Sequence, residues 1–133
     1  TDLESLYYYR GAAFLKLENY EEAIDDLDSS IEINKTKVES YYLRGVAKLK
    51  LKNYEDSITD FTYAIELNTH NLEEELYLSR GISYFHLKQF DLALMDFDKY
   101  PTKNSNFAQV YHYKYLIYKN QQNSFFQESY AFA

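Results

Sequence analysis

Cysteine is absent from the 133 residues, so the chain can form neither a disulfide framework nor a thiolate metal site. One proline and three glycines leave few helix breakers, which favours long helices. No run of about 18 apolar residues occurs and no signal-peptide pattern opens the chain. We therefore expect an intracellular, cytoplasmic protein that does not insert into a membrane.

Positive charge is also scarce, with 14 Lys and Arg against 21 Asp and Glu and a net charge of −7. Proteins that neutralise phosphates normally carry a basic face, so this balance disfavours nucleic acid as a partner, and with it an RNA-binding helical repeat. No Gly-rich phosphate loop or nucleophile elbow is present. We expect no enzymatic activity and no cofactor.

Metal ligands are not arranged for a metal site. The three histidines, His70, His86 and His112, lack the spacing of a zinc-binding helix. The acidic cluster within Glu21–Asp28 lacks the glycine turn and ligand spacing of a calcium loop. We interpret these side chains as solvated polar groups and expect no bound metal.

Apolar and aromatic residues are abundant, at 46% and 19% of the chain, and they repeat. Residues 7–33, 41–67 and 77–100 align, and Gly11, Gly45 and Gly81 are 34 and 36 residues apart. An aromatic and then a small residue follow each glycine at fixed spacings: Tyr20 and Ala23, Tyr54 and Ser57, Phe90 and Ala93. Each repeat carries two apolar stripes at spacings of three and four with a short break between them, which predicts an antiparallel pair of helices.

The three segments resemble the tetratricopeptide repeat, a helix–turn–helix of roughly 34 residues with an Ala-x3-Phe core pair. Ala23 with Leu27, Ser57 with Phe61, and Ala93 with Phe97 fill that pattern. The resemblance implies a single all-α domain over residues 1–133, a right-handed superhelix of antiparallel helix pairs. It would hold three regular units and a divergent fourth, at about residues 4–37, 38–71, 74–101 and 105–133.

Two departures concern the end of the array. Pro101 follows Tyr100 early, which predicts a shortened second helix in the third unit. Residues 105–133 lack the Arg-Gly signature, and we expect two helices there with a turn at 121–124. The absence of an initial Met and the apolar last stretch suggest a piece of a longer protein or a processed product.

Small and charged residues that recur in phase are expected to be structural. A glycine inside a helix costs roughly 1 kcal/mol against alanine, so three in phase indicate close approach of the helix backbones. An Arg precedes each glycine and an Asp follows sixteen residues after that Arg, which predicts an Arg–carboxylate bond between helices, although solvated charges would show the same pattern. The expected structural residues are Gly11, Gly45, Gly81, Ala23, Ser57, Ala93, Arg10, Arg44, Arg80, Asp26, Asp60 and Asp96.

By resemblance, the first helices form the inner wall of a groove. Its candidate contact residues are Tyr8, Tyr9, Ala12, Lys16, Tyr42, Leu43, Val46, Lys50, Leu78, Ile82, Phe85 and His86. Relatives that grip the acidic C-termini of chaperones use a clamp of Lys, Asn and Arg. The matching positions here are Tyr8, Ala12, Leu43, Glu75 and Ser79, none of which is a clamp residue. We expect an apolar, aromatic groove that holds a peptide segment without a carboxylate clamp.

Two functions remain open. The first is a peptide-binding adaptor that uses this groove. The second is a scaffold segment of a larger protein, buried in a multiprotein complex, in which the wall residues only pack against neighbouring first helices.

Overall fold

The computed structural model describes residues 1–67, 71–100 and 107–131, with side chains as far as Ser129. These residues form helices and no strand, which confirms the predicted all-α class. The helices are α1 (Asp2–Lys16), α2 (Tyr20–Ile33), α3 (Val38–Lys50), α4 (Tyr54–Glu66), α5 (Glu73–His86), α6 (Phe90–Asp98) and α7 (Phe107–Ala131). His70 and Pro101 lie outside the described residues.

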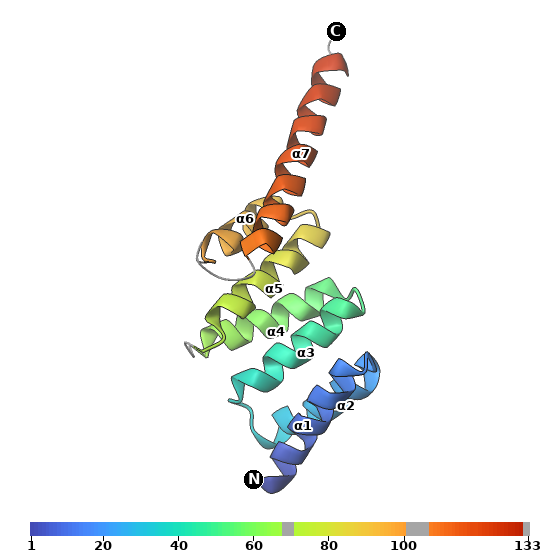
Figure 1. Cartoon of the computed structure of the whole chain (residues 1–133), viewed down its shortest axis with the longest axis vertical. Helices are drawn as coiled ribbons and strands as arrows, with labels where there is room; N and C mark the ends of the chain where they lie inside the picture. Colours follow the sequence, from blue (N-terminus) through green and yellow to red (C-terminus); the bar gives the residue numbers. More distant parts are fainter. Residues whose placement is uncertain (68–70, 101–106, 132–133) are drawn as a thin grey trace.

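The first six helices form three antiparallel pairs that stack into a solenoid (Figure 1). The pairs are α1 with α2, α3 with α4, and α5 with α6, and each second helix also packs on the next first helix. The first helices α1, α3, α5 and α7 contact one another in sequence. The predicted solenoid of helix pairs is therefore confirmed.

The turn between the two helices of each pair is a Schellman motif without glycine. Glu18, Lys52 and Lys88 occupy the left-handed region, with φ of 62°, 64° and 59°. The next amide donates to a carbonyl five residues earlier, as Asn53 does to Lys48 at 2.9 Å. This pattern satisfies the free carbonyls at the end of the first helix and reverses the chain.

The recurring glycines leave room for a buried ring. A Cβ atom placed on Gly45 would lie 2.6 Å from Phe61, and one on Gly81 would lie 2.6 Å from Phe97. At Gly11 the neighbour is Leu27, at 3.0 Å. Sequence reasoning expected two backbones in close approach, but in the second and third pairs the glycine faces the side chain that ends the Ala-x3-Phe pattern.

The end of the array differs from the sequence-based expectation in one respect. α6 has 9 residues against 14 in α2 and 13 in α4, which confirms the shortened second helix. The turn predicted at 121–124 is wrong, because α7 runs as a single helix of 25 residues through it. Gln121, Gln122, Asn123 and Ser124 include neither glycine nor proline, so nothing there breaks the helix.

Candidate functional site

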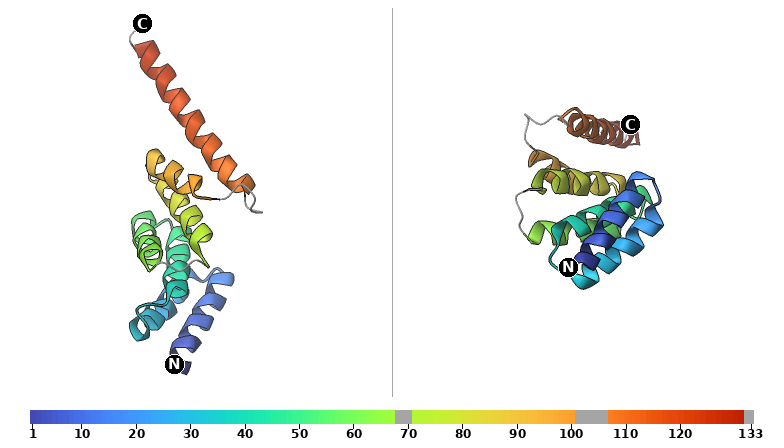
Figure 2. Two further views of the ribbon diagram at one scale, coloured as in Figure 1. Left: turned by 90° about the vertical axis from the view of Figure 1, so that its left-hand side faces the viewer. Right: turned by 60° about the horizontal axis from the view of Figure 1, so that its bottom comes forward.

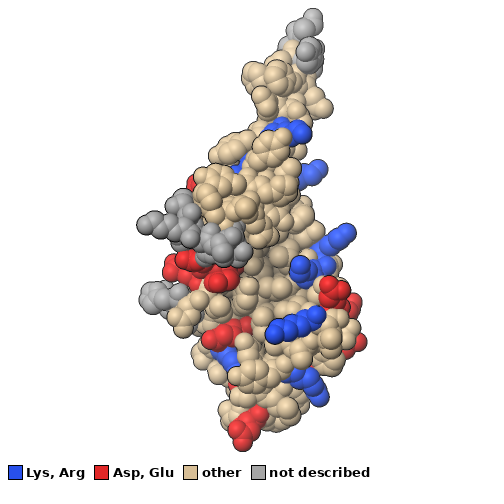
Figure 3. Space-filling view, viewed as in Figure 1, with Lys and Arg blue, Asp and Glu red and all other residues tan. Residues whose placement is uncertain are grey.

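The first helices line one side of the stack and the second helices line the other. Figure 2 (left) shows α1 and α5 on one side and α2, α4 and α6 on the opposite side. Figure 3 looks onto the side of the first helices. Acidic residues gather mainly along its left edge and basic residues mainly along its right, with uncharged surface between them.

The two charged edges follow from the sequence of each first helix. The first turns carry acidic residues: Asp2 and Glu4 in α1, Glu39 in α3, and Glu73, Glu74 and Glu75 in α5. The last turns of α1 and α3 carry basic ones: Lys16 in α1, and Lys48 and Lys50 in α3. Both placements complement the helix dipole. Because the three helices lie side by side, their ends add up to an acidic edge and a basic edge.

The α1 part of the wall is aromatic and open. Tyr9 is 68% exposed, and its ring lies 5.1 Å from that of Tyr8 in an edge-on arrangement. The Lys37 ammonium sits 4.0 Å above the centre of the Tyr8 ring, a cation–π contact. Burial, followed by the negative charge of Glu39, raises the pKa of Tyr8, so its hydroxyl stays protonated and can donate a hydrogen bond. Ala12 is half-buried and Lys16 is exposed.

The α3 part of the wall is more enclosed. Tyr42, Leu43 and Val46 are half-buried, and Lys50 is exposed at the end of the helix. The Tyr42 ring lies 6.2 Å from the Phe61 ring, so it rests on the core of its own pair. Burial raises the pKa of Tyr42, against a hydrogen bond with Ser79 that lowers it. This tyrosine thus presents only part of its surface.

The α5 part of the wall is largely covered. Leu78 and Ile82 are 7% and 9% exposed and lie in one buried cluster with Val110 and Ile117 of α7. They therefore offer little surface to a ligand, which sequence reasoning missed because it depends on where α7 packs. Phe85 is half-buried, with its ring 5.1 Å from that of Tyr113 in α7.

His86 and Phe85 border a hollow where α5, the α5–α6 turn and α7 meet. It has a volume of about 340 Å³ and is lined by Phe85, His86, Lys88, Phe90, Leu116 and Asn120. His86 is stacked on Tyr54, with ring centres 4.8 Å apart. Burial, followed by the charge of Lys52, lowers the pKa of His86, which favours the neutral imidazole. The hollow is thus a mostly apolar extension of the wall that also contains the Lys88 side chain.

The recurring Arg–Asp pairs form in all three units. Arg10, Arg44 and Arg80 each donate two hydrogen bonds of 2.7–2.9 Å to the Asp sixteen residues later. Each bond joins the first helix of a pair to the second, so the predicted Arg–carboxylate bond is confirmed. The three aspartates are buried.

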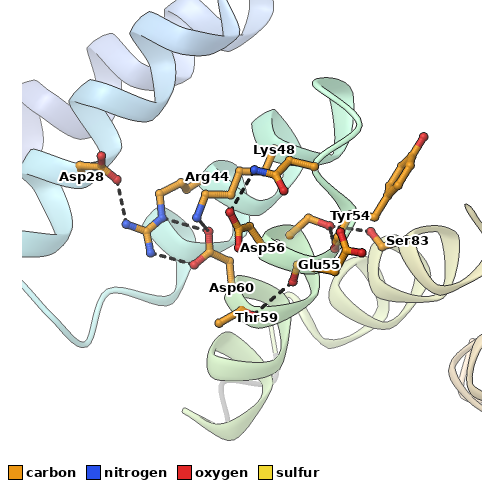
Figure 4. Close-up of polar contacts among 11 residues, drawn as sticks. Asp28, Arg44, Lys48, Tyr54, Glu55, Asp56, Thr59, Asp60 and Ser83 are labelled. Carbon is orange, nitrogen blue, oxygen red and sulfur yellow. Dashed lines mark hydrogen bonds and ion pairs between the residues drawn. The ribbon is translucent and has the colours of Figure 1, made fainter. Parts of the chain in front are cut away.

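Arg44 also joins two neighbouring pairs (Figure 4). Its Nη1 donates to Asp28 of α2 at 2.8 Å, while Lys48 lies 3.0 Å from Asp60. Burial lowers the pKa of Arg44, but the hydrogen bonds to Asp60 and Asp28 outweigh it, and the pKa lies above its usual value. In the next unit Thr62 stands where Asp28 stands here, and it accepts a 3.2 Å bond from Arg80.

A second polar network was missed by sequence reasoning because it does not repeat. Glu4, 5% exposed, accepts a 2.7 Å hydrogen bond from Ser30 and lies 3.0 Å from the Lys37 ammonium. Ser30 in turn bonds Ser40 at 2.8 Å. Burial raises the pKa of Glu4, but the bonds from Ser30 and Lys37 outweigh it and the net pKa is lowered. The network ties α1, α2 and α3 together.

The described residues contain no group of three His, Asp or Glu placed to hold a metal ion. Within the same residues, no helix is both long and apolar enough to cross a membrane.

Comparison with known proteins identifies the repeat. Two models of the tetratricopeptide repeat match residues 5–37 and 38–71. No curated protein sequence matches the chain. The TPR domain of Arabidopsis OM64 superimposes with a TM-score of 0.79 over 90% of this chain and 97% of that domain, at 20% identity.

Two further structures share the fold. The second TPR of Spaghetti (RPAP3), bound to the HSP90 peptide SRMEEVD, gives a TM-score of 0.67 at 27% identity over 72% of this chain and 87% of that one. The Hsp90 co-chaperone Cns1 of Saccharomyces cerevisiae gives 0.83 at 17% identity, covering 98% of this chain and 43% of Cns1.

Proposed function

The chain belongs to the tetratricopeptide repeat family, and on this basis we propose that it is a non-catalytic module that binds a peptide segment of a partner protein. The binding surface is the wall formed by α1 and α3, extended by the hollow next to Phe85. The observation that carries the proposal is the open aromatic surface of α1. Tyr9 leaves 68% of its side chain exposed beside the half-buried Tyr8.

The chemistry of the wall favours apolar anchors. Leu43, Val46 and Ala12 supply aliphatic surface, and the hydroxyls of Tyr8 and Tyr9 can bond a peptide backbone. Rigid tyrosines bury a large area at low cost in side-chain entropy, which is why they serve as anchors in interfaces. A peptide with two or three apolar side chains fits this wall best.

The same wall disfavours an acidic C-terminus, which the neighbouring RPAP3 domain holds as the peptide SRMEEVD. The positions that match the carboxylate clamp carry Tyr8, Ala12, Leu43, Glu75 and Ser79. None is a cation, and Glu75 adds a negative charge where a clamp carries a donor. A carboxylate placed at these positions loses its water without gaining a free cation, because Lys37, which lies above the Tyr8 ring, is already paired with Glu4.

A binding assay with two kinds of peptide tests the proposal. Peptides selected from a random display library on the full chain should carry apolar anchors and bind the labelled protein saturably by fluorescence anisotropy. Labelled SRMEEVD should bind with a Kd weaker than about 1 mM. Saturable binding of SRMEEVD at micromolar concentration would contradict the absence of a clamp.

Two matched variants test the location. Tyr9→Ala removes an exposed side chain from the wall, whereas Tyr63→Ala removes a tyrosine of α4 that is 40% exposed. The first should weaken the selected peptides about tenfold or more, and the second should not. Equal affinity of the two variants would rule out the α1 wall as the binding surface.

One observation favours the scaffold as a second function. Leu92 and Met95 of α6 are 43% and 60% exposed, on a second helix rather than on the wall of α1 and α3. A scaffold segment would cover both faces with neighbours. Affinity purification of the tagged full chain would then recover a complex that survives Tyr9→Ala and is lost on Leu92→Glu.

A further inference from the structure

The outer face of α7 carries an unbroken stripe at heptad spacing. Tyr111, Tyr115, Tyr118, Gln122 and Phe125 follow at intervals of four, three, four and three residues, the spacing of positions a and d in a coiled coil. The four aromatic members are 54%, 59%, 57% and 65% exposed in chain order, and Gln122 is also exposed. We refer to these five residues as the α7 seam.

The seam is a different face from the one that α7 packs on the solenoid. α7 buries Val110 and Ile117 in the core cluster of the third pair and stacks Tyr113 on Phe97. Beyond Ile117, every described side chain of α7 is exposed. Figure 1 shows why, because this half of the helix rises past the helix pairs. Nothing in the described residues covers the seam.

The surface of the seam has the shape that receives another helix. A shallow hollow is lined by Tyr115, Tyr118, Lys119 and Gln122, which stand at positions i, i+3, i+4 and i+7. Four residues at that spacing make the hole into which a facing helix inserts one side chain. A peptide strand or a flat surface would not fill a row of such holes, so the occupant is a helix with the same period.

We propose that the occupant is α7 of a second copy of this chain, paired in the antiparallel direction. The pairing sets Tyr118 opposite Gln122 of the second copy and Tyr115 opposite Phe125 of the second copy. The two amides at Gln122 then lie near the two-fold axis among tyrosine hydroxyls. A polar side chain inside a seam fixes the register of a coiled coil.

Charge selects this direction over the parallel one. On one flank of the seam, antiparallel pairing brings Lys114 beside Glu128 of the second copy, twice by symmetry, whereas parallel pairing brings Lys114 beside Lys119. Lys114 already lies 2.6 Å from Asp98, and its ammonium has further donors for a second carboxylate. The Lys119 side chains of the two copies lie near each other at the two-fold axis. Their long aliphatic stems allow the ammonium groups to point into the solvent.

The acidic solenoid favours the same direction. The chain has a net charge of −7, and α7 carries Lys114 and Lys119 against Glu128, so the negative charge belongs to the helix pairs. Parallel pairing would place two acidic solenoids side by side. Antiparallel pairing places the two solenoids at opposite ends of the paired helices, where dissolved ions screen their repulsion.

Disulfide trapping tests the direction cleanly because the chain has no cysteine of its own. Tyr115→Cys mixed with Phe125→Cys should cross-link under mild oxidation. Phe125→Cys alone should not, since its two copies are ten residues out of register, about 15 Å along the helix, beyond the reach of a disulfide. Cross-linking of Phe125→Cys with itself, or no cross-link in the mixture, would overturn the antiparallel pair.

Sedimentation equilibrium of the full chain tests the seam itself. We expect a mass of twice the chain's 15.9 kDa at high concentration. Tyr118→Glu should raise the dimer dissociation constant about a hundredfold, since pairing would bury one unpaired carboxylate from each copy opposite Gln122 of the other. Asn123→Glu makes a similar change on the other side of the same exposed helix and should leave it within about threefold. A monomer at every concentration, or equal effects of the two variants, would refute the proposal.

Discussion

Replacing Arg44 with methionine removes the side chain that joins three helices. Its guanidinium gives two hydrogen bonds to Asp60, at 2.9 and 2.7 Å, and one to Asp28 at 2.8 Å. The Asp60 side chain is only 4% exposed, so the variant leaves a buried carboxylate with a single cation, Lys48, at 3.0 Å. Methionine keeps most of the apolar stem and so isolates the loss of the charge.

The magnitude follows from the two bonds to the buried partner. A hydrogen bond to a charged group contributes about 1.5–3 kcal/mol, and Lys48 retains part of the compensation. We expect the free energy of unfolding to fall by about 3 kcal/mol, which corresponds to a melting temperature lower by about 10 °C for a chain of this size. The exposed ion pair between Arg44 and Asp28 contributes little, so Asp28→Asn should change the free energy of unfolding by about 0.5 kcal/mol or less.

Urea and thermal unfolding followed by circular dichroism measure both values. A double variant, Arg44→Met with Asp60→Leu, removes the buried charge together with its partner and should recover to within about 1 kcal/mol of the wild type. An unchanged melting temperature for Arg44→Met would show that the Arg44–Asp60 bonds do not stabilise the fold. A double variant no more stable than the single one would show that the uncompensated carboxylate is not the cause.

The remaining predictions concern the repeat and its polar links. Gly45→Ala should destabilise the fold by about 1–3 kcal/mol in urea unfolding, because its Cβ would lie 2.6 Å from the buried Phe61 ring. Gly11→Ala should destabilise it less, because the nearest atom there lies 3.0 Å away. Equal losses of stability would contradict the clash with the ring as the cause. Lys52→Gly should stabilise by about 0.5–1 kcal/mol in the same assay, since φ is 64° there, and a loss of stability would argue against backbone strain. Because the pKa of Glu4 is lowered in the folded state, the ionised carboxylate contributes fully to the free energy of unfolding above the unfolded pKa of about 4.3. This contribution is lost as the pH falls through the folded pKa, so Glu4→Gln should reduce the loss of stability at acid pH. The same loss of stability in the variant and the wild type would refute this.

Much of the fold could be predicted from the sequence because it repeats. Gly45, Arg44 and Asp60 recur in phase with their counterparts, and a residue that recurs at one phase meets the same neighbour in each unit. The antiparallel pairs could be predicted from that periodicity, and it favoured the Arg–Asp bonds over solvated charges. The features that do not repeat were missed, such as the buried Glu4 with Ser30.

Two other misses have different causes. The Schellman turns could not be predicted because Lys52 and its counterparts occupy the left-handed positions, where a glycine would have indicated such a turn. The burial of Leu78 and Ile82 depends on the packing of α7, a tertiary contact that no local sequence pattern predicts. Periodicity likewise could not separate one long α7 from two short helices, since 121–124 is polar without containing a helix breaker.

The location of a bound peptide shows whether the wall of α1 and α3 is the binding surface. An amide correlation spectrum of the labelled full chain, titrated with a selected peptide, reports which residues sense the ligand. We expect the largest shifts at Tyr9 and Ala12 of α1 and at Leu43 and Val46 of α3, with α2 and α4 little changed. Shifts confined to α2, α4 and α6, or to the α7 seam, would contradict this expectation.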